Sequence, residues 1–305
     1  MLGFIVKRLG LALLVALAVS AIAFFLLRLS GDIAVAIAGE GAQQADLDVI
    51  RKTYGLDRPL VVQYLDWLLK TLSGDFGTSI YFKTDVASLV FAKVPVTLIL
   101  GLSSLAFALA ISIPLGVLAA LYANSWIDRL ALAIAVFGQA MPNFFFALIL
   151  VMLFSITLRW LPVSGSGTWL HYVMPTIALG YYTAPAFMRL IRAGMIEVLS
   201  ADYIRTARAK GLSSHAVIIT HALRNAAVPV VALTAVQLGF LLGGSVVIET
   251  IFALDGLGYL AYQSITYKDF PVMQVIVLLL SVVYVLLTLL ADIANAWLDP
   301  RIRVS

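Results

Sequence analysis

Six long apolar runs constrain this chain more than any other feature of its sequence. Crossing about 30 Å of hydrocarbon takes a helix of about 20 apolar residues. Within hydrocarbon every backbone N–H and C=O must be paired inside the protein, so such runs are expected to be helical. We therefore predict an all-α, polytopic membrane protein with six transmembrane helices. The runs lie at about 9–29, 97–121, 130–158, 172–190, 227–249 and 272–294.

Composition supports this prediction. Hydrophobic residues make up 62% of the 305 residues, charged residues make up 12%, and the mean hydropathy is +1.04. Soluble domains carry about 25% charged residues. The first run, Leu9 to Leu27, resembles a signal peptide but is longer than the usual apolar region of one. We therefore interpret residues 1–29 as an uncleaved N-terminal transmembrane helix.

The distribution of Lys and Arg predicts which segments face the cytoplasm. An even number of spans puts both termini on one side, and basic residues are enriched on the cytoplasmic side. With both termini inside, the inner segments carry 11 of the 20 basic residues but only 5 of the 16 acidic residues. We therefore expect cytoplasmic termini, including a tail at 299–305. The pI near 9.3 does not indicate a nucleic-acid partner, because the basic residues lie beside membrane segments.

Residues 30–96 are predicted to form an extracytoplasmic helical insert. Gly55 is expected to end a helix over 45–54, and Pro59 is expected to occupy the first turn of the next helix. Four residues of that second helix recur at helical spacing and are expected to form one buried stripe, namely Leu60, Tyr64, Trp67 and Leu68.

The second half of the insert contains a turn and a short helix. Gly74 to Gly77 is typical of a tight turn, and Asp85 is expected to cap a last short helix before Pro95. The insert either caps the outer mouth of a pore or contacts a substrate-delivery protein. The sequence does not separate these two interpretations.

The longest basic, polar stretch runs from Ala201 to Pro229. Ser200 is expected to cap a short helix, and Gly211 is expected to end it in a left-handed conformation. Ser213 or Ser214 is expected to cap a second helix. The basic pattern alone favours an amphipathic segment that rests on anionic lipid.

The residues of this stretch also resemble a known loop. IRTARAKG…HALRNA…PV is similar to the cytoplasmic "EAA" loop of ABC importer permeases, which docks into a groove on the ATPase subunit. The glycine of that loop falls on Gly211, and the EAA triplet falls on Arg205, Thr206 and Ala207, of which only the alanine is retained. Arg224 stands where the loop usually has proline.

These departures match one branch, the B-type permeases of dipeptide, oligopeptide, glutathione and nickel importers. The insert also resembles that branch at two motifs. GLxxPLxxQY begins here at Gly55, and GDFGxS spans Gly74 to Ser79. The outer loop from Glu249 to Pro271 is also similar, although Asp255 replaces the usual proline before Gly-Leu-Gly.

The resemblance implies a type I ABC importer permease fold, with a transmembrane core at 97–298 and a coupling loop at 197–226. It implies a bacterial inner-membrane subunit, surrounded by lipid, that pairs with a homologous second permease, two ATPases and an extracytoplasmic binding protein. ATP and Mg are then bound by the partners, and this chain has no cofactor. The implied cargo is short peptides, with glutathione, a nickel chelate or opine-like compounds as alternatives. The residues implied in coupling are Tyr203, Arg205, Ala207, Arg208, Lys210, Gly211 and Leu212.

The polar groups expected within the membrane are amides, hydroxyls and glycines. Such groups either face a translocation path or form hydrogen bonds and close contacts between helices. We assign them to the path as candidates, namely Gln139, Asn143, Gln237, Gly243, Ser245 and Gln274. No ionisable residue is expected near the midplane, which argues against an ion-coupled secondary carrier, the main alternative.

The sequence offers no catalytic or metal-binding motif. It lacks a GxxxxGK[ST] phosphate loop, an HExxH motif and any cysteine. His215 and His221 are six residues apart and would not share a helix face. We therefore predict a transport subunit rather than a membrane enzyme, with no metal site.

Overall fold

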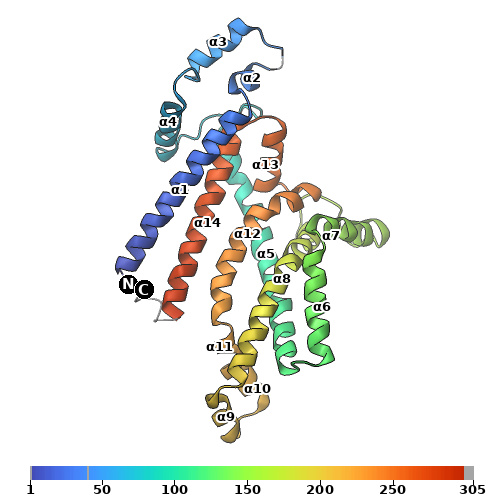
Figure 1. The fold of residues 1–305 in the computed structure, drawn as a ribbon. Helices are drawn as coiled ribbons and strands as arrows, with labels where there is room; N and C mark the ends of the chain where they lie inside the picture. Colours follow the sequence, from blue (N-terminus) through green and yellow to red (C-terminus); the bar gives the residue numbers. More distant parts are fainter. Residues whose placement is uncertain (1, 40, 299–305) are drawn as a thin grey trace.

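The computed structural model describes residues 2–39 and 41–298, and the predicted tail at 299–305 lies outside the described residues. Apart from one β-bridge between Thr78 and Asp85, every regular element of the described residues is a helix (Figure 1). In chain order the elements are α1 (Leu2–Ser30), α2 (Ile33–Ala38), α3 (Gln44–Thr53), α4 (Leu60–Leu72), α5 (Val86–Leu121), α6 (Trp126–Ala140), α7 (Asn143–Leu150), the π-helix η1 (Val151–Thr157), α8 (Leu170–Leu199), α9 (Asp202–Ala209), α10 (Ser214–Ala216), the π-helix η2 (Val217–Leu223), α11 (Arg224–Ala226), α12 (Val228–Ile251), α13 (Leu257–Thr266) and α14 (Phe270–Leu298). The prediction of an all-α chain is confirmed.

Four of the described helices are long and apolar enough to cross a membrane, and a fifth span results if one bent pair of helices counts as one. The four are α1 over Lys7–Leu29, α5, α12, and α14 over Phe270–Ala294. The fourth predicted run, 172–190, lies in α8, a helix of 30 residues. Its tyrosines, threonines and prolines make α8 less apolar than the others, and the structure buries it in the middle of the bundle, where such side chains find partners.

The third predicted run, 130–158, is not one straight helix. It breaks after Ala140, and the segment Asn143–Thr157 is bent by 98° from Trp126–Ala140. Pro142 explains the break, because its nitrogen has no hydrogen to donate and its ring excludes a continuing helix. Beyond the bend, Val151–Thr157 continues as a π-helix.

Helices α5 and α8 pack more closely than side chains other than glycine would allow. Gly180 of α8 lies against the carbonyl oxygen of Ser104 in α5, and a Cβ at Gly180 would clash with it. Small residues let helices approach in this way within lipid. The Ser112 hydroxyl adds a hydrogen bond of 2.6 Å to the Ala184 carbonyl oxygen. The largest cluster of buried side chains surrounds this contact and extends to α12.

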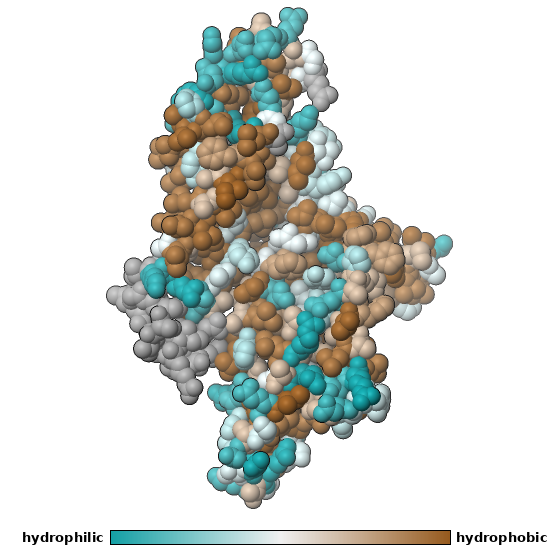
Figure 2. All heavy atoms as spheres, viewed as in Figure 1, coloured by the Kyte–Doolittle hydropathy of each residue, from teal (hydrophilic) through white to brown (hydrophobic). Residues whose placement is uncertain are grey.

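The molecule has two polar ends separated by an apolar middle. Figure 2 shows hydrophobic residues over the middle and hydrophilic residues at both tips. The insert lies at one tip, and α9 lies at the other (Figure 1). The start of α1 and the end of α14 lie away from the insert, and an ion pair of 2.7 Å between Arg8 and Asp292 joins them. We call the two tips the insert end and the knob end.

The first half of the insert matches the prediction in most respects. Gly55 follows α3 with φ of +64°, which confirms the predicted helix end. Pro59 precedes α4 as its N-terminal cap. Tyr64 and Trp67 pack on Phe24 of α1 with ring centroids 5.5 and 5.8 Å apart. Leu60 is 40% exposed, so its assignment to the buried stripe is wrong, because α4 meets α1 only through its later turns.

The second half of the insert differs from the prediction at its end. Gly74 and Gly77 both have positive φ, which confirms the turn. The Asp85 carboxylate accepts a hydrogen bond of 2.8 Å from the Ser88 amide, which confirms the cap. The helix that it caps is not short, however, since α5 continues through Pro95 to Leu121. The insert therefore comprises residues 31–85, and the predicted boundary at 96/97 lies inside a helix.

Candidate coupling site and translocation path

Residues 197–226, which we call the knob, form a compact projection at the knob end (Figure 1). Helix α9 ends in a reversal at Gly211, whose φ is +78°. The Gly211 amide donates to the Arg208 carbonyl oxygen at 3.0 Å, and the Leu212 amide donates to the Ala207 carbonyl oxygen at 3.4 Å. This pair of hydrogen bonds defines a Schellman turn, which confirms the predicted glycine corner.

One of the two predicted caps is wrong. The Ser213 hydroxyl accepts from the Ala216 amide at 3.3 Å and caps the second helix as predicted. Ser200 instead ends α8, and its hydroxyl donates to the Glu197 carbonyl oxygen at 2.7 Å. Helix α9 begins after Ala201 with no side-chain cap. The turn between α8 and α9 is so short that Ser200 still belongs to the preceding helix.

The knob is held to the protein by apolar contacts. Ile204 and Ala207, one turn apart on α9, are 0% and 7% exposed and belong to the same buried cluster as Val217 and Ala222 of η2. Ala207 therefore faces the inside of the knob and not an outer surface. The small side chain of Ala207 lets α9 lie close to η2. An alanine is therefore needed here for packing inside the knob, and not for close approach to a partner protein.

The other predicted coupling residues are exposed. Tyr203 is 46% exposed and Leu212 is 42% exposed, and Arg205, Arg208, Lys210 and Gly211 are exposed as well. The Tyr203 hydroxyl accepts a hydrogen bond of 3.2 Å from the Asn225 amide, which fixes its ring against α11. Arg205 forms an ion pair of 3.3 Å with Asp202, a contact of the kind that adds little stability at a surface.

A buried ion pair fixes α8 to α6 near the knob. The Arg192 guanidinium donates to both carboxylate oxygens of Asp128, at 2.6 and 2.7 Å, and the Asp128 side chain is 3% exposed. The Asn124 amide donates to the same carboxylate at 2.8 Å. Next to this pair, Gly194 lies against the Ala226 backbone, so α8 also touches α11 closely. These two contacts fix the end of α8 nearest the knob to α6 and to α11.

At the insert end, the fully buried carboxylate of Glu249 accepts hydrogen bonds from three helices, α5, α12 and α13. Glu249 of α12 accepts from the hydroxyls of Thr97 in α5 and Ser245 in α12, both at 2.8 Å. It also accepts from the amides of Gly258 and Tyr259 in α13, at 2.7 and 3.1 Å. Sequence analysis placed Glu249 at the edge of the membrane and missed this role. The Gly-Leu-Gly segment that follows Glu249 was the one sequence signal for this role. Successive backbone amides in such a turn can bind an anion, and the Glu249 carboxylate is that anion here.

A second buried carboxylate fixes the insert to α14. Asp269 accepts from the Ser79 hydroxyl and from the amides of Ile80 and Tyr81, at 3.1 and 3.2 Å. The Ser79 hydroxyl in turn accepts from the Phe82 amide at 2.8 Å. This network gives a physical reason for the serine of the GDFGxS motif, since Ser79 joins the turn of the insert to the start of α14.

The residues predicted to line a path fall into two groups. Gln139 is exposed and accepts from Arg189 at 2.9 Å, Asn143 and Gln237 are half-buried, and Gly243 faces open space. Ser245 and Gln274 are buried instead. Ser245 serves the Glu249 carboxylate, and Gln274 lies beneath the insert. Four of the six candidates are thus accessible and two are buried, and their assignment to a path stays a prediction.

Comparisons with known proteins identify the family of the chain. The family described as "Binding-protein-dependent transport system inner membrane component" matches residues 112–304, and its N-terminal counterpart matches residues 1–101. The glutathione transport system permease proteins GsiC of Escherichia coli K12 and Salmonella typhimurium LT2 are each 40% identical over 305 residues, with 99% of both chains covered.

Solved structures show the same fold. A chain of the MetNI methionine ABC transporter aligns with a TM-score of 0.59 and 21% identity, covering 70% of this chain and 97% of that one. An amino acid ABC transporter aligns with a TM-score of 0.50 and 17% identity. The predicted ABC importer permease fold is therefore confirmed. ATP is bound by partner ATPases in this family, and the chain is not catalytic. The chain belongs to the family of binding-protein-dependent transport system inner membrane components, as a multi-pass permease subunit of a bacterial ABC importer.

Proposed function

We propose that the knob is the surface through which ATPase subunits drive this permease. The observation that supports the proposal is the division of the knob into a buried side and a charged side. Ile204 and Ala207 seat α9 on η2, while the rest of α9 and its turn remain exposed. A rigid projection of this kind can enter a groove on a partner, and its arginines can pair with carboxylates there. The proposed contact residues are Tyr203, Arg205, Arg208, Lys210, Gly211 and Leu212.

The chain is then one half of a translocation path, and a homologous second permease forms the other half. Two ATPases move the two knobs. Helices α8 and α12 both extend from the knob toward the insert end, so movement of the knob tilts them and opens the path to one side at a time. The residues proposed to line the path are Gln139, Asn143, Gln237 and Gly243, which remain accessible. Neutral amides suit a path whose energy is supplied by other subunits.

The proposed cargo is short peptides, with glutathione foremost. Identity of 40% over nearly the whole length to glutathione permeases supports this cargo, and glutathione is itself a peptide. In this proposal both termini and the knob face the cytoplasm, as the distribution of basic residues predicts. The insert then faces outward, where residues 40–90 contact the binding protein that delivers the cargo.

Replacing Gly211 with valine tests the coupling role. A valine at φ of +78° is strained by about 1–3 kcal/mol, although a Cβ there meets nothing within 4 Å. We expect Gly211→Val to insert in the membrane with its partner permease but to lose copurification of the ATPases or substrate-stimulated ATP hydrolysis.

Gly74→Val is the matched control for this experiment. Gly74 has φ of +86° and open space beside it, but it lies in the insert. The control should retain the ATPases. Normal transport by Gly211→Val would reject the coupling role, because a loop that merely rests on lipid tolerates a distorted corner.

The cargo requires a separate measurement. The binding protein encoded with this permease should be purified, and the ligand it releases on denaturation should be identified by mass spectrometry. We expect a short peptide or glutathione. Release of a nickel chelate or an opine-like compound would overturn the proposed cargo without affecting the coupling role.

A further inference from the structure

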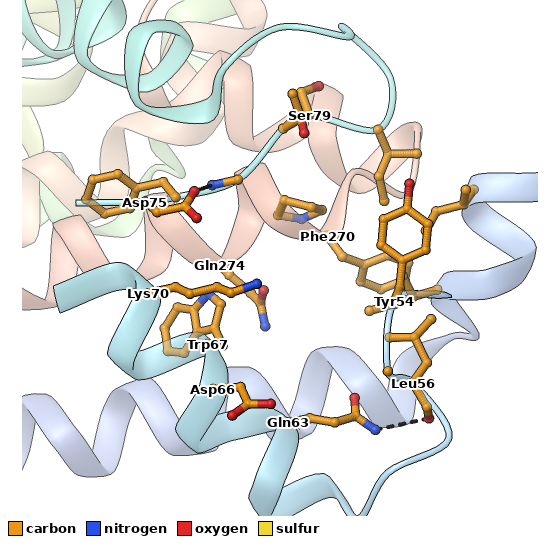
Figure 3. Close-up of a pocket in the computed structure, with 18 of the residues that line it drawn as sticks. Tyr54, Leu56, Gln63, Asp66, Trp67, Lys70, Asp75, Ser79, Phe270 and Gln274 are labelled. Atoms are coloured by element: carbon orange, nitrogen blue, oxygen red, sulfur yellow. Dashed lines mark hydrogen bonds between the residues drawn. The ribbon is translucent and has the colours of Figure 1, made fainter. Parts of the chain in front are cut away.

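A cavity of about 540 Å³ lies between the insert and the neighbouring ends of α1 and α14. Figure 3 shows Trp67 and Lys70 of α4 and Gln274 of α14 pointing toward the same space. The cavity is large enough for a small ligand or a lipid headgroup. Four basic and two acidic residues line it, so it carries an excess of positive charge.

Two buried glutamines in the wall of this cavity have polar atoms without partners. Gln63 is 8% exposed, and its amide nitrogen donates to the carbonyl oxygens of Leu56 and Arg58, at 3.0 and 2.8 Å (Figure 3). Those bonds fix the orientation of the amide and leave Gln63 Oε1 as an acceptor without a donor. Gln274 is 5% exposed, and its Nε2 is a donor without an acceptor. Buried polar atoms in proteins are nearly always paired. These two atoms therefore suit a ligand that donates a hydrogen bond to Gln63 Oε1 and accepts one from Gln274 Nε2.

A cation beside these glutamines also has no anion. The Arg28 guanidinium lies 4.9 Å from the centre of the Phe24 ring, and its buried Nε has no hydrogen-bond partner. No carboxylate in the described part of the chain forms an ion pair with Arg28. A charge removed from water is costly unless it is paired, so this part of the cavity is suited to an anionic group.

The surroundings indicate that the ligand comes from the membrane. Helix α4 lines the cavity with Gln63, Asp66, Trp67 and Lys70 and exposes a separate row of leucines. This is the pattern of a helix that lies in the bilayer interface with its apolar face in lipid. Around the cavity the exposed apolar side chains are Leu65 (50%), Leu69 (66%) and Leu72 (75%) of α4, and Leu26 (61%) and Leu29 (76%) of α1.

We propose that this cavity binds the headgroup of a phosphatidylethanolamine from the leaflet on the insert side. The phosphate accepts hydrogen bonds from Arg28, Lys70 and Gln274 Nε2, and the primary ammonium donates to Gln63 Oε1. The acyl chains lie along the exposed leucines of α1 and α4. A choline headgroup lacks the N–H that Gln63 Oε1 requires. A glycerol headgroup supplies a hydroxyl donor but no cation to face Asp66 and Asp75, the two carboxylates that line the cavity, so the cavity favours ethanolamine.

The test uses the purified transporter complex, delipidated in detergent. Its melting temperature is measured with added phosphatidylethanolamine, phosphatidylglycerol or phosphatidylcholine, and retained lipid is identified by native mass spectrometry. We expect phosphatidylethanolamine to raise the melting temperature most, since a ligand that binds only the folded state stabilises it. Arg28→Gln and Gln274→Leu should each weaken the apparent affinity by about tenfold or more, because each removes a donor to the phosphate.

Two controls separate a lipid site from a structural defect. Gln274→Leu without lipid should be no less stable than the wild type, since it removes a donor that has no partner. Lys52→Gln, at an exposed position of α3 outside the cavity, should keep the full response to lipid. Equal stabilisation by all three lipids, or an unchanged response in both cavity variants, would overturn the proposal. An equal effect of soluble glycerophosphoethanolamine would assign the site to a free compound and overturn the membrane source.

Discussion

Both ends of the molecule contain a sharp corner between helices, but their charged side chains differ in burial. At the knob end, Gly211 turns the chain after α9, and Asp202 at the start of α9 has a side chain that is 93% exposed. At the insert end, the Gly256 to Gly258 corner wraps around Glu249, which is 0% exposed. The knob keeps its ionisable groups in water, whereas the insert end encloses a carboxylate and satisfies it with donors from three segments.

This difference separates a surface meant for a partner from a joint internal to the chain. The knob is held mainly by apolar side chains, so its charged side chains stay exposed and can pair with another protein. At the insert end, Glu249 and Asp269 join α5, α12, α13, α14 and the insert through hydrogen bonds that a partner cannot reach. Substitutions at the two ends should therefore fail differently, the first in coupling and the second in folding.

Removal of the buried carboxylate is expected to have the largest effect. Glu249→Ala leaves the Thr97 hydroxyl and the Gly258 and Tyr259 amides without an acceptor, whereas the Ser245 hydroxyl can still donate to the Leu242 carbonyl oxygen. Each orphaned buried donor costs about 1–3 kcal/mol. We expect a loss of at least about 3 kcal/mol and poor recovery of the assembled complex, measured by membrane expression and melting temperature. Water that enters the site would reduce this loss.

Two further variants make the comparison between the ends quantitative. Glu249→Gln keeps an acceptor and should cost less than Glu249→Ala. Asp202→Ala removes an exposed carboxylate at the knob and should change stability by about 0.5 kcal/mol or less. If Asp202→Ala destabilised the complex as much as Glu249→Ala, the proposed division between a partner surface and an internal joint would fail.

The pair between Asp128 and Arg192 is the exception at the knob end and should give an intermediate effect. Asp128→Asn weakens two charge-assisted hydrogen bonds, but Arg192 is 23% exposed and can turn toward water. We expect a loss of about 1–3 kcal/mol, with a parallel loss of ATPase coupling because α8 is released from α6. The double variant Asp128→Leu with Arg192→Met should recover stability, since an apolar pair can replace a buried ion pair. A double variant no more stable than Asp128→Asn would show that the pair itself is required.

The sequence predicted what depends on local pattern and missed what depends on long-range pairing. The Gly55 helix end, the Gly211 corner and the Asp85 cap were found because each depends on one residue type at one place. The length of α5 was not predicted, because Pro95 favours a break in the helix. Packing of the insert and the start of α5 against α14 overrides that preference. The partners of Glu249 lie up to 152 residues away, and those of Asp269 up to 190. No spacing rule connects residues so distant, so the insert-end joint and the cavity beneath the insert needed the structure.

The smallest expected effect concerns the exposed side of the insert and the ion pair between Asp32 and Arg51. The Arg51 guanidinium, 2.6 Å from the carboxylate, lowers the pKa of Asp32, and the Ala34 amide lowers it further. A lowered pKa in the folded state stabilises α2 and α3 above the pKa of the unfolded chain, about 3.9. That contribution is lost as the pH falls through the folded value.

Hydrogen exchange of residues 33–53 at a series of pH values, compared with Asp32→Asn at each pH, measures this contribution. The wild type should be more protected than the variant near pH 7, and the difference should shrink as the pH falls below about 3.9. Asp57→Asn, at an exposed position in the same insert, should match the wild type throughout. A difference that stayed constant at every pH would assign the effect to the cap formed by Asp32 and not to its charge. An exposed pair at the insert end would then resemble those at the knob, where ionised groups add little to folding and are left for partners.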